Sequence, residues 1–137
     1  MSILLLTAFL LLTSCIPCSQ DPGLLATARP FFEQFKIAES NVCDIHYGII
    51  DEDTAGLANI QIHRCDITID PFLTTYQEHA TILHEIGHCV GLDHVAKPDE
   101  IMSVNVPHEY YLQDNWEKLI KTFNKQLKRH RNDNTKD

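Results

Sequence analysis

The residues from His84 to His94 constrain the fold of this chain more than any other feature, and they read HEIGHCVGLDH. His84 and His88 are four positions apart, so on a helix both imidazoles project from one face and can bind one metal ion. A third ligand must approach from another direction. Gly91 lets the chain leave the helix, since glycine tolerates positive φ, and His94 can then fold back toward the ion. Three neutral imidazoles suit zinc and leave a fourth position open for water.

A bare HExxH run also occurs on ordinary helices, whereas here Gly91 and His94 complete a longer pattern. Met102 follows His94 by eight residues. This arrangement resembles that of the metzincin metallopeptidases, HExxHxxGxxH followed by a Met-turn, and the spacing to Met102 is most similar to that of the matrixins. The resemblance implies that Glu85 is the general base and that Met102 forms an apolar floor beneath three zinc ligands, His84, His88 and His94.

Departures from the matrixin pattern leave the substrate preference open. Val95 follows the third histidine, where matrixins usually have Ser or Thr. The run from Ser103 to Pro107 lacks the Pro and Tyr that wall the matrixin side-chain pocket. Val104 stands where astacin-like and serralysin-like enzymes have a tyrosine that binds zinc, so this additional ligand is not expected here.

The N-terminal residues have the character of an export signal. Residues 3–12 are almost entirely apolar but too few to span a bilayer, which needs about 20 residues. The run LTSC that ends at Cys15 resembles a bacterial lipobox, although no Lys or Arg precedes the apolar run. We therefore expect a signal peptide at 1–14, lipidation of Cys15, and an exported protein anchored to a bacterial membrane. A plain secretory signal cut near Cys15 is the alternative.

The four remaining cysteines fit an exported protein and allow three full pairings. Apolar alternation places Cys43 and Cys65 on the inward faces of two strands, which favours a disulfide between them. Cys89 lies in the zinc helix and is expected to remain free and buried. Cys18 lies in a short tether at 15–23 that is rich in turn residues. Because nothing offsets the entropy of holding this tether in the cleft, Cys18 is not expected to bind the zinc.

Hydrophobic periodicity and turn residues predict the other elements. The expected order is a helix at 30–39, strands at 42–50, 56–62 and 65–70, the zinc helix from about residue 76, and a final helix at 113–129. A capping box from Thr75 to Glu78 begins the zinc helix. The shift of apolar parity after Ile62 predicts a turn or bulge near His63 and Arg64.

This order predicts one α+β domain at 24–130, followed by a polar tail at 131–137. By resemblance it is a reduced metzincin-like (zincin) fold, in which a small twisted mixed sheet covers the active-site helix and a C-terminal helix completes the domain. In that family the edge strand beside the cleft pairs with substrate in an extended conformation. The segment from Gly56 to Gln61 is the expected edge strand.

Composition and the motif together predict a function. The net charge of −8 argues against nucleic acid as a partner. We expect a monomeric zinc endopeptidase that hydrolyses extended peptides through a zinc-bound water, with one catalytic Zn²⁺ and Glu85 as the base. The alternative is a lipid-anchored, zinc-containing binding protein without proteolytic activity. Glu85 distinguishes the two hypotheses, because a binding protein need not retain the base.

Overall fold

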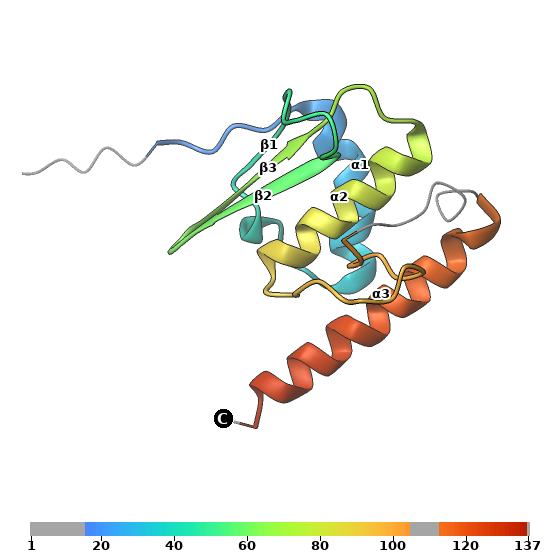
Figure 1. Ribbon diagram of the computed structural model, residues 1–137. Helices are drawn as coiled ribbons and strands as arrows, with labels where there is room; N and C mark the ends of the chain where they lie inside the picture. Colours follow the sequence, from blue (N-terminus) through green and yellow to red (C-terminus); the bar gives the residue numbers. More distant parts are fainter. Residues whose placement is uncertain (1–15, 105–112, 137) are drawn as a thin grey trace, which may run out of the picture.

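The computed structural model describes residues 16–104 and 113–136, so the expected signal segment and Cys15 lie outside the described residues. The chain forms an α+β arrangement of helices with one small sheet (Figure 1). Its elements, in chain order, are α1 (Pro22–Phe35), the 3₁₀ helix η1 (Glu39–Asn41), β1 (Asp44–Tyr47), β2 (Gly56–Gln61), β3 (Arg64–Ile69), α2 (Thr75–Cys89) and α3 (Gln113–Asn134). Among the residues that the structure describes, no helix combines the length and apolar character that a bilayer crossing requires.

The sheet has three strands in the order β1-β3-β2 and is mixed, as expected. β1 runs parallel to β3, and β2 runs antiparallel to it. β2 therefore lies at an edge of the sheet, which confirms the edge position expected for this segment. The turn between β2 and β3 is a tight one at Ile62 and His63, because Gln61 pairs directly with Arg64 and no bulge intervenes.

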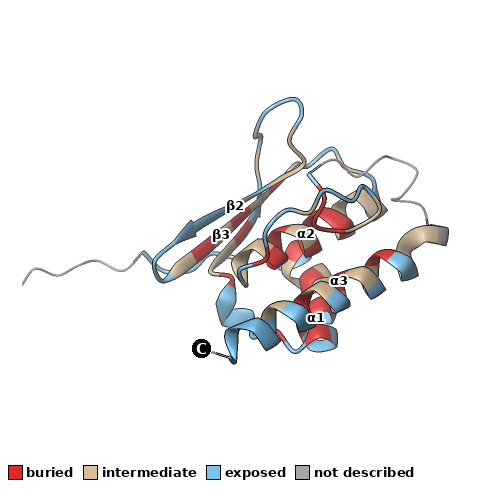
Figure 2. Cartoon of the chain, turned by 60° about the horizontal axis from the view of Figure 1, so that its bottom comes forward, coloured by how far each residue is buried: buried red, intermediate tan, exposed pale blue. Residues whose placement is uncertain are grey.

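One face of the sheet packs against the helices and the other is open to solvent (Figure 2). β3 alternates strictly, with Cys65, Ile67 and Ile69 buried and the residues between them half-buried. The helix side of the sheet meets apolar side chains of α1, α2 and α3 in one core. Its fully buried members include Leu24, Ile45, Ile67, Ile69, Ile82, Leu83, Ile86, Met102, Leu119, Phe123 and Leu127.

The first helix begins earlier than the sequence suggested. α1 starts at Pro22 because Asp21 is a good N-cap: its side chain accepts hydrogen bonds from the amides of Gly23 and Leu24. Pro30 lies inside this helix, so the prediction that it begins the helix is wrong. The helix ends at Phe35, and its C-cap Lys36 adopts φ 53° in the left-handed region.

The segment before α1 does not behave as the expected tether. Gln20 forms a parallel bridge with Ile45, and the backbones of Asp21 and Ile45 are joined by a hydrogen bond of 2.8 Å. The guanidinium of Arg64 donates to the carbonyl of Ile16 and forms ion pairs with Asp44 and Asp66, two carboxylates that flank it. Residues 16–21 therefore lie along β1 and shield that edge, so within residues 16–104 and 113–136 the unpaired edge of the sheet is that of β2.

The expected Cys43–Cys65 disulfide is wrong. Cys18 pairs with Cys43, and Cys65 pairs with Cys89, so Cys89 is not free. The physical reason is which elements pack together: the inward face of β3 directs Cys65 toward the end of α2, while residues 16–21 bring Cys18 beside β1. Cys18 has no thiol available for zinc, in agreement with the expectation that it does not bind the metal.

The remaining helices differ from expectation at their ends. α2 is capped by Thr74, whose capping box uses Gln77, so the predicted box at Thr75 is shifted by one residue. α3 continues to Asn134 and includes part of the expected polar tail. Arg131, in this added part of α3, joins the helix to the end of α1, because its guanidinium donates to the carbonyls of Phe35 and Lys36.

Candidate metal centre

The last two turns of α2 present His84 and His88 on one face, as their spacing predicted. Their Nε2 atoms lie 3.0 Å apart. The helix ends after Cys89, and Gly91 adopts φ 96°, a conformation that side chains disfavour. The chain then folds back and brings His94 Nε2 to 3.1 Å from His84 Nε2 and 3.0 Å from His88 Nε2. The structure thus brings together all three predicted ligands.

Backbone carbonyls orient two of these imidazoles. Nδ1 of His84 lies 2.6 Å from the carbonyl oxygen of Ile101, and Nδ1 of His88 lies 2.9 Å from that of Leu92. A carbonyl only accepts, so each Nδ1 carries a hydrogen and each Nε2 keeps its lone pair. These lone pairs point toward one another at about 3 Å, an arrangement that a cation between them would stabilise. Outer hydrogen bonds of this kind are typical of metal-binding histidines.

The electrostatics and the distances of this group suit a metal. Burial lowers the pKa of His84 to about 4 and also lowers the pKa of His88, so both rings are neutral at neutral pH and can act as ligands. Three atoms 3.0–3.1 Å apart can all lie about 2.0–2.1 Å from one point, the usual Zn–N distance. The His84, His88 and His94 group could therefore hold a metal ion.

Glu85 lies beside this group under the edge strand. Only 5% of the residue is exposed, and the backbone N–H of Ala58 in β2 donates a hydrogen bond to its carboxylate. Burial raises the pKa of Glu85 to about 7, and the hydrogen bond from Ala58 opposes this rise. A carboxyl group with such a pKa can both take up and release a proton near neutral pH.

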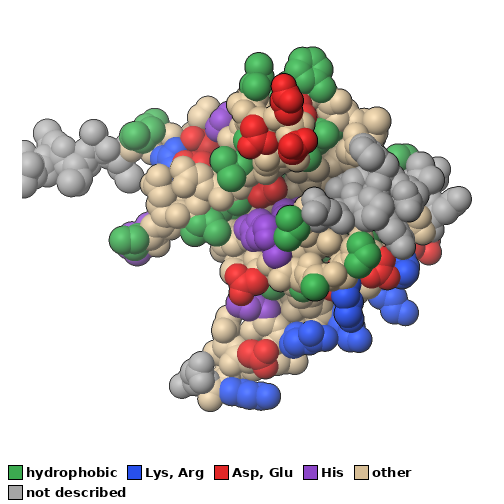
Figure 3. All heavy atoms as spheres, in the orientation of Figure 1, with side chains coloured by type: hydrophobic (Ala, Val, Ile, Leu, Met, Phe, Trp, Pro, Cys, Tyr) green, Lys and Arg blue, Asp and Glu red, His purple; other side chains and the backbone are tan. Residues whose placement is uncertain are grey.

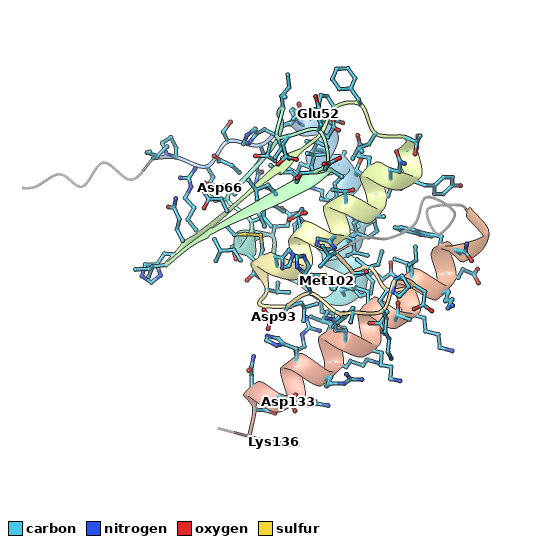
Figure 4. The ribbon with its side chains drawn as sticks, in the orientation of Figure 1. Glu52, Asp66, Asp93, Met102, Asp133 and Lys136 are labelled. Carbon is cyan, nitrogen blue, oxygen red and sulfur yellow. A yellow bond between two sulfur atoms is a disulfide. The ribbon has the colours of Figure 1, made fainter. Side chains whose placement is uncertain are left out.

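Met102 is fully buried against α2, and Figure 4 marks it beside that helix. A Cβ on Gly87 would lie 2.5 Å from the Met102 sulfur, so only glycine lets the thioether approach the helix backbone at this point. The Met102 carbonyl also accepts a hydrogen bond from the amide of Val95. This segment thus joins the loop of the third histidine to the carbonyl of Ile101 that orients His84.

The loop that carries His94 contacts α3, and local sequence patterns did not predict this contact. Gln126 Nε2 donates to the carbonyl of Asp93, which is marked in the loop in Figure 4. His130 Nε2 would lie 3.0 Å from a Cβ on Gly91, so α3 also confines the turn where the chain leaves α2. Gln126 and His130 are one helical turn apart, and that spacing is the only signal in the sequence that could have grouped them.

One cleft between β2 and α2, with a volume of about 760 Å³, is lined by Glu85 and by the three histidines His84, His88 and His94. Figure 3 shows histidine side chains gathered beside this hollow. β2 contributes Gly56, Ala58 and Ile60 to its lining, and the segment after the His94 loop contributes Ile101, Ser103 and Val104. The edge of β2, the three histidines and the Glu85 carboxylate thus share one solvent-accessible space.

A second acidic and sulfur group does not suit a metal. The side chains of Cys43, Asp44 and Asp66 lie close together. Cys43 is in a disulfide, and both carboxylates form ion pairs with Arg64 at 2.7 and 2.8 Å. This group therefore stabilises the sheet and the N-terminal segment, and offers no donor set for a cation.

Comparison with protein-family models, with curated protein sequences and with solved structures gives no significant match.

The two disulfides close loops of nearly equal length, but only Cys65–Cys89 includes a residue next to one of the three histidines. Cys65–Cys89 spans 24 residues and Cys18–Cys43 spans 25. Replacing either pair by alanines is expected to lower the free energy of unfolding by about 3–4 kcal/mol in the chain-entropy account. Because Cys89 directly follows His88, loss of Cys65–Cys89 should also weaken zinc binding by about 10-fold, as loss of outer-shell support does elsewhere.

Urea unfolding and zinc titration against a competing chelator measure the two effects separately. The Cys18→Ala/Cys43→Ala protein is the matched control and should lose stability while keeping its zinc affinity. Unchanged zinc affinity in Cys65→Ala/Cys89→Ala, or an equal loss in both double variants, would refute the role given to Cys89.

Proposed function

We propose that this protein is a zinc-dependent endopeptidase with a reduced metzincin-like fold, and that His84, His88 and His94 are its zinc ligands. The observation that carries the proposal is the meeting of three convergent Nε2 atoms and the buried Glu85 carboxylate beneath an open strand edge. Three neutral imidazoles are a common catalytic zinc set, because they leave a coordination position open. The Met102 packing and the fold of His94 after Gly91 agree with the metzincin resemblance.

The edge of β2 is the proposed binding surface for an extended peptide. Backbone groups of Gly56 and Ile60, and the carbonyl of Ala58, point away from β3, since the alternate residues of β2 make the bonds to that strand. A peptide can add its own hydrogen bonds along such an edge. The scissile bond of a peptide on this edge then lies over the histidines, because β2 and the three histidines line the same cleft.

Glu85 moves the proton in this proposal. When bound, zinc supplies Lewis acidity, which lowers the pKa of water and polarises a carbonyl. The Glu85 carboxylate takes a proton from the attacking water and passes it to the leaving amine. Burial suits the carboxyl to both transfers, since it raises the pKa of Glu85 to about 7.

Export of the protein remains part of the proposal. Two disulfides within the described residues favour an oxidising compartment. The apolar segment before residue 15 and the lipobox-like LTSC run support export with a lipid anchor at Cys15. In this arrangement residues 16–21 pack on the sheet, so the catalytic domain lies close to the membrane surface.

The test is digestion of a panel of denatured proteins before and after removal of zinc. The zinc-loaded protein should produce new peptide termini, a chelator should abolish them, and about one equivalent of zinc should restore them. Mass spectrometry of the products gives the cleavage sites. A protein that holds one zinc per chain and cleaves no member of the panel would support the alternative, a zinc-containing binding protein.

A further inference from the structure

Gly56 lies where β2 passes directly over the carboxylate of Glu85. A Cβ at this position would lie 2.8 Å from Glu85 Oε1, 3.0 Å from Glu85 Cγ and 2.5 Å from Thr81 Cγ2. Gly56 has no positive φ, unlike Gly91, so backbone conformation does not require glycine here. The requirement is one of space: any side chain on Gly56 would collide with Glu85 and with the helix face beside it.

Two residues further along β2, the Ala58 amide makes a hydrogen bond to the same carboxylate. The direction of this amide follows from the ladder. Ala55 accepts a hydrogen bond from Asp70, so Ala55, Leu57 and Asn59 are the residues that bond to β3. Ala58 belongs to the alternate series, and its N–H points toward the open edge, where Glu85 lies.

We propose that Gly56 and the Ala58 amide together form a seat that positions the Glu85 carboxylate for proton transfer, an inference that rests on the proposed endopeptidase function. Gly56 leaves the space that the carboxylate occupies, and Ala58 holds it there by a hydrogen bond. Both come from an edge strand that is far from Glu85 in the sequence. They are positioning residues, since they act through Glu85.

The seat predicts a specific defect in Gly56→Ala. The added methyl group must displace Glu85 or Thr81. If Glu85 moves, its carboxylate loses the hydrogen bond from the Ala58 N–H. Because a misplacement of about 1 Å can cost about 100-fold in rate, kcat should fall about 10- to 100-fold while KM changes little. Zinc content should stay at one ion per chain, since the nearest atoms to the new methyl belong to Thr81 and Glu85 and to none of the histidines.

Two further variants separate the seat from general crowding. Gly48→Ala is the matched control: its Cβ would lie 2.8 Å from Thr68 Cγ2, a collision of similar size that is outside the cleft. It should retain the wild-type kcat. Thr81→Ser in the Gly56→Ala background removes the collision with Thr81 but leaves the one with Glu85, so it should not restore kcat.

Ala58→Pro tests the hydrogen bond without adding bulk at Gly56. It removes the N–H that Glu85 accepts, and an edge strand tolerates proline where the N–H points outward. Ala58→Pro should show the same fall in kcat and should keep its zinc. If Gly56→Ala does not fold, the kcat of Ala58→Pro alone tests whether the seat positions Glu85.

Crystal structures of the zinc-loaded variants give a readout that does not depend on activity. The Glu85 carboxylate should have left its position beside the Ala58 nitrogen in Gly56→Ala. If Glu85 stays in place with unchanged kcat, or if Thr81→Ser restores kcat, the seat does not exist. If wild type cleaves nothing, the endopeptidase proposal fails, and the position of Glu85 in these structures still tests the seat.

Discussion

Glu85→Gln is expected to keep one zinc per chain and to lose about 10²- to 10⁴-fold in peptide hydrolysis, the range typical of a missing general base. The amide has nearly the shape of the carboxylate, and its oxygen can still accept from the Ala58 N–H, so the local packing should remain. What it lacks is the ability to take up a proton from water. Zinc analysis and steady-state kinetics on the same preparation measure both quantities.

Glu78→Gln provides the matched control on the same helix. Glu78 accepts a hydrogen bond from the Tyr47 hydroxyl at 2.8 Å and does not line the cleft. Its replacement removes a carboxylate from α2 without touching the centre and should leave hydrolysis unchanged. Full activity in Glu85→Gln would contradict the proposed chemistry, whatever its zinc content.

Replacing any one of the three histidines by alanine should abolish tight zinc binding. Each variant keeps only two of the three imidazole ligands, whose Nε2 atoms are 3.0–3.1 Å apart in the wild type. Zinc at about 100 times its dissociation constant should stabilise the wild-type protein by about 2.7 kcal/mol, which corresponds to roughly 10 °C in Tm. His84→Ala, His88→Ala and His94→Ala should show no such zinc-dependent rise.

Thermal unfolding with and without zinc measures this effect. His63→Ala is the control, because His63 is exposed in the turn between β2 and β3 and lies outside the cleft. It should retain the wild-type rise in Tm. A variant at His84, His88 or His94 that keeps the full rise would show that zinc binds elsewhere.

The sequence was most informative where a structural feature depends on near neighbours. His84 and His88 share a helix face because of their spacing alone, and Gly91 with φ 96° is a local requirement of the turn to His94. The strict alternation of β3 likewise identified an inward face from a period of two. The edge position of β2 was expected from the family resemblance, and the sheet order confirms it.

Features that depend on which surfaces meet were not predictable from one sequence. Alternation identified the inward face of Cys65 but not the helix end opposite it, so its pairing with Cys89 was missed. Composition suggested a tether at residues 15–23. The packing of residues 16–21 along β1 was missed, because their backbone partners are distant in the chain. The sequence predicted Gly56 only as the start of a strand. Its contact with Glu85 depends on how the sheet crosses α2, which no local pattern shows.

The most direct test of this account is anomalous diffraction at the zinc edge from crystals of the zinc-loaded protein. We predict one strong peak at about 2.0–2.1 Å from Nε2 of His84, His88 and His94, with the Glu85 carboxylate outside the coordination sphere and beside the Ala58 amide. A peak elsewhere, or direct coordination by Glu85, would contradict the assignment of three histidine ligands and a free base.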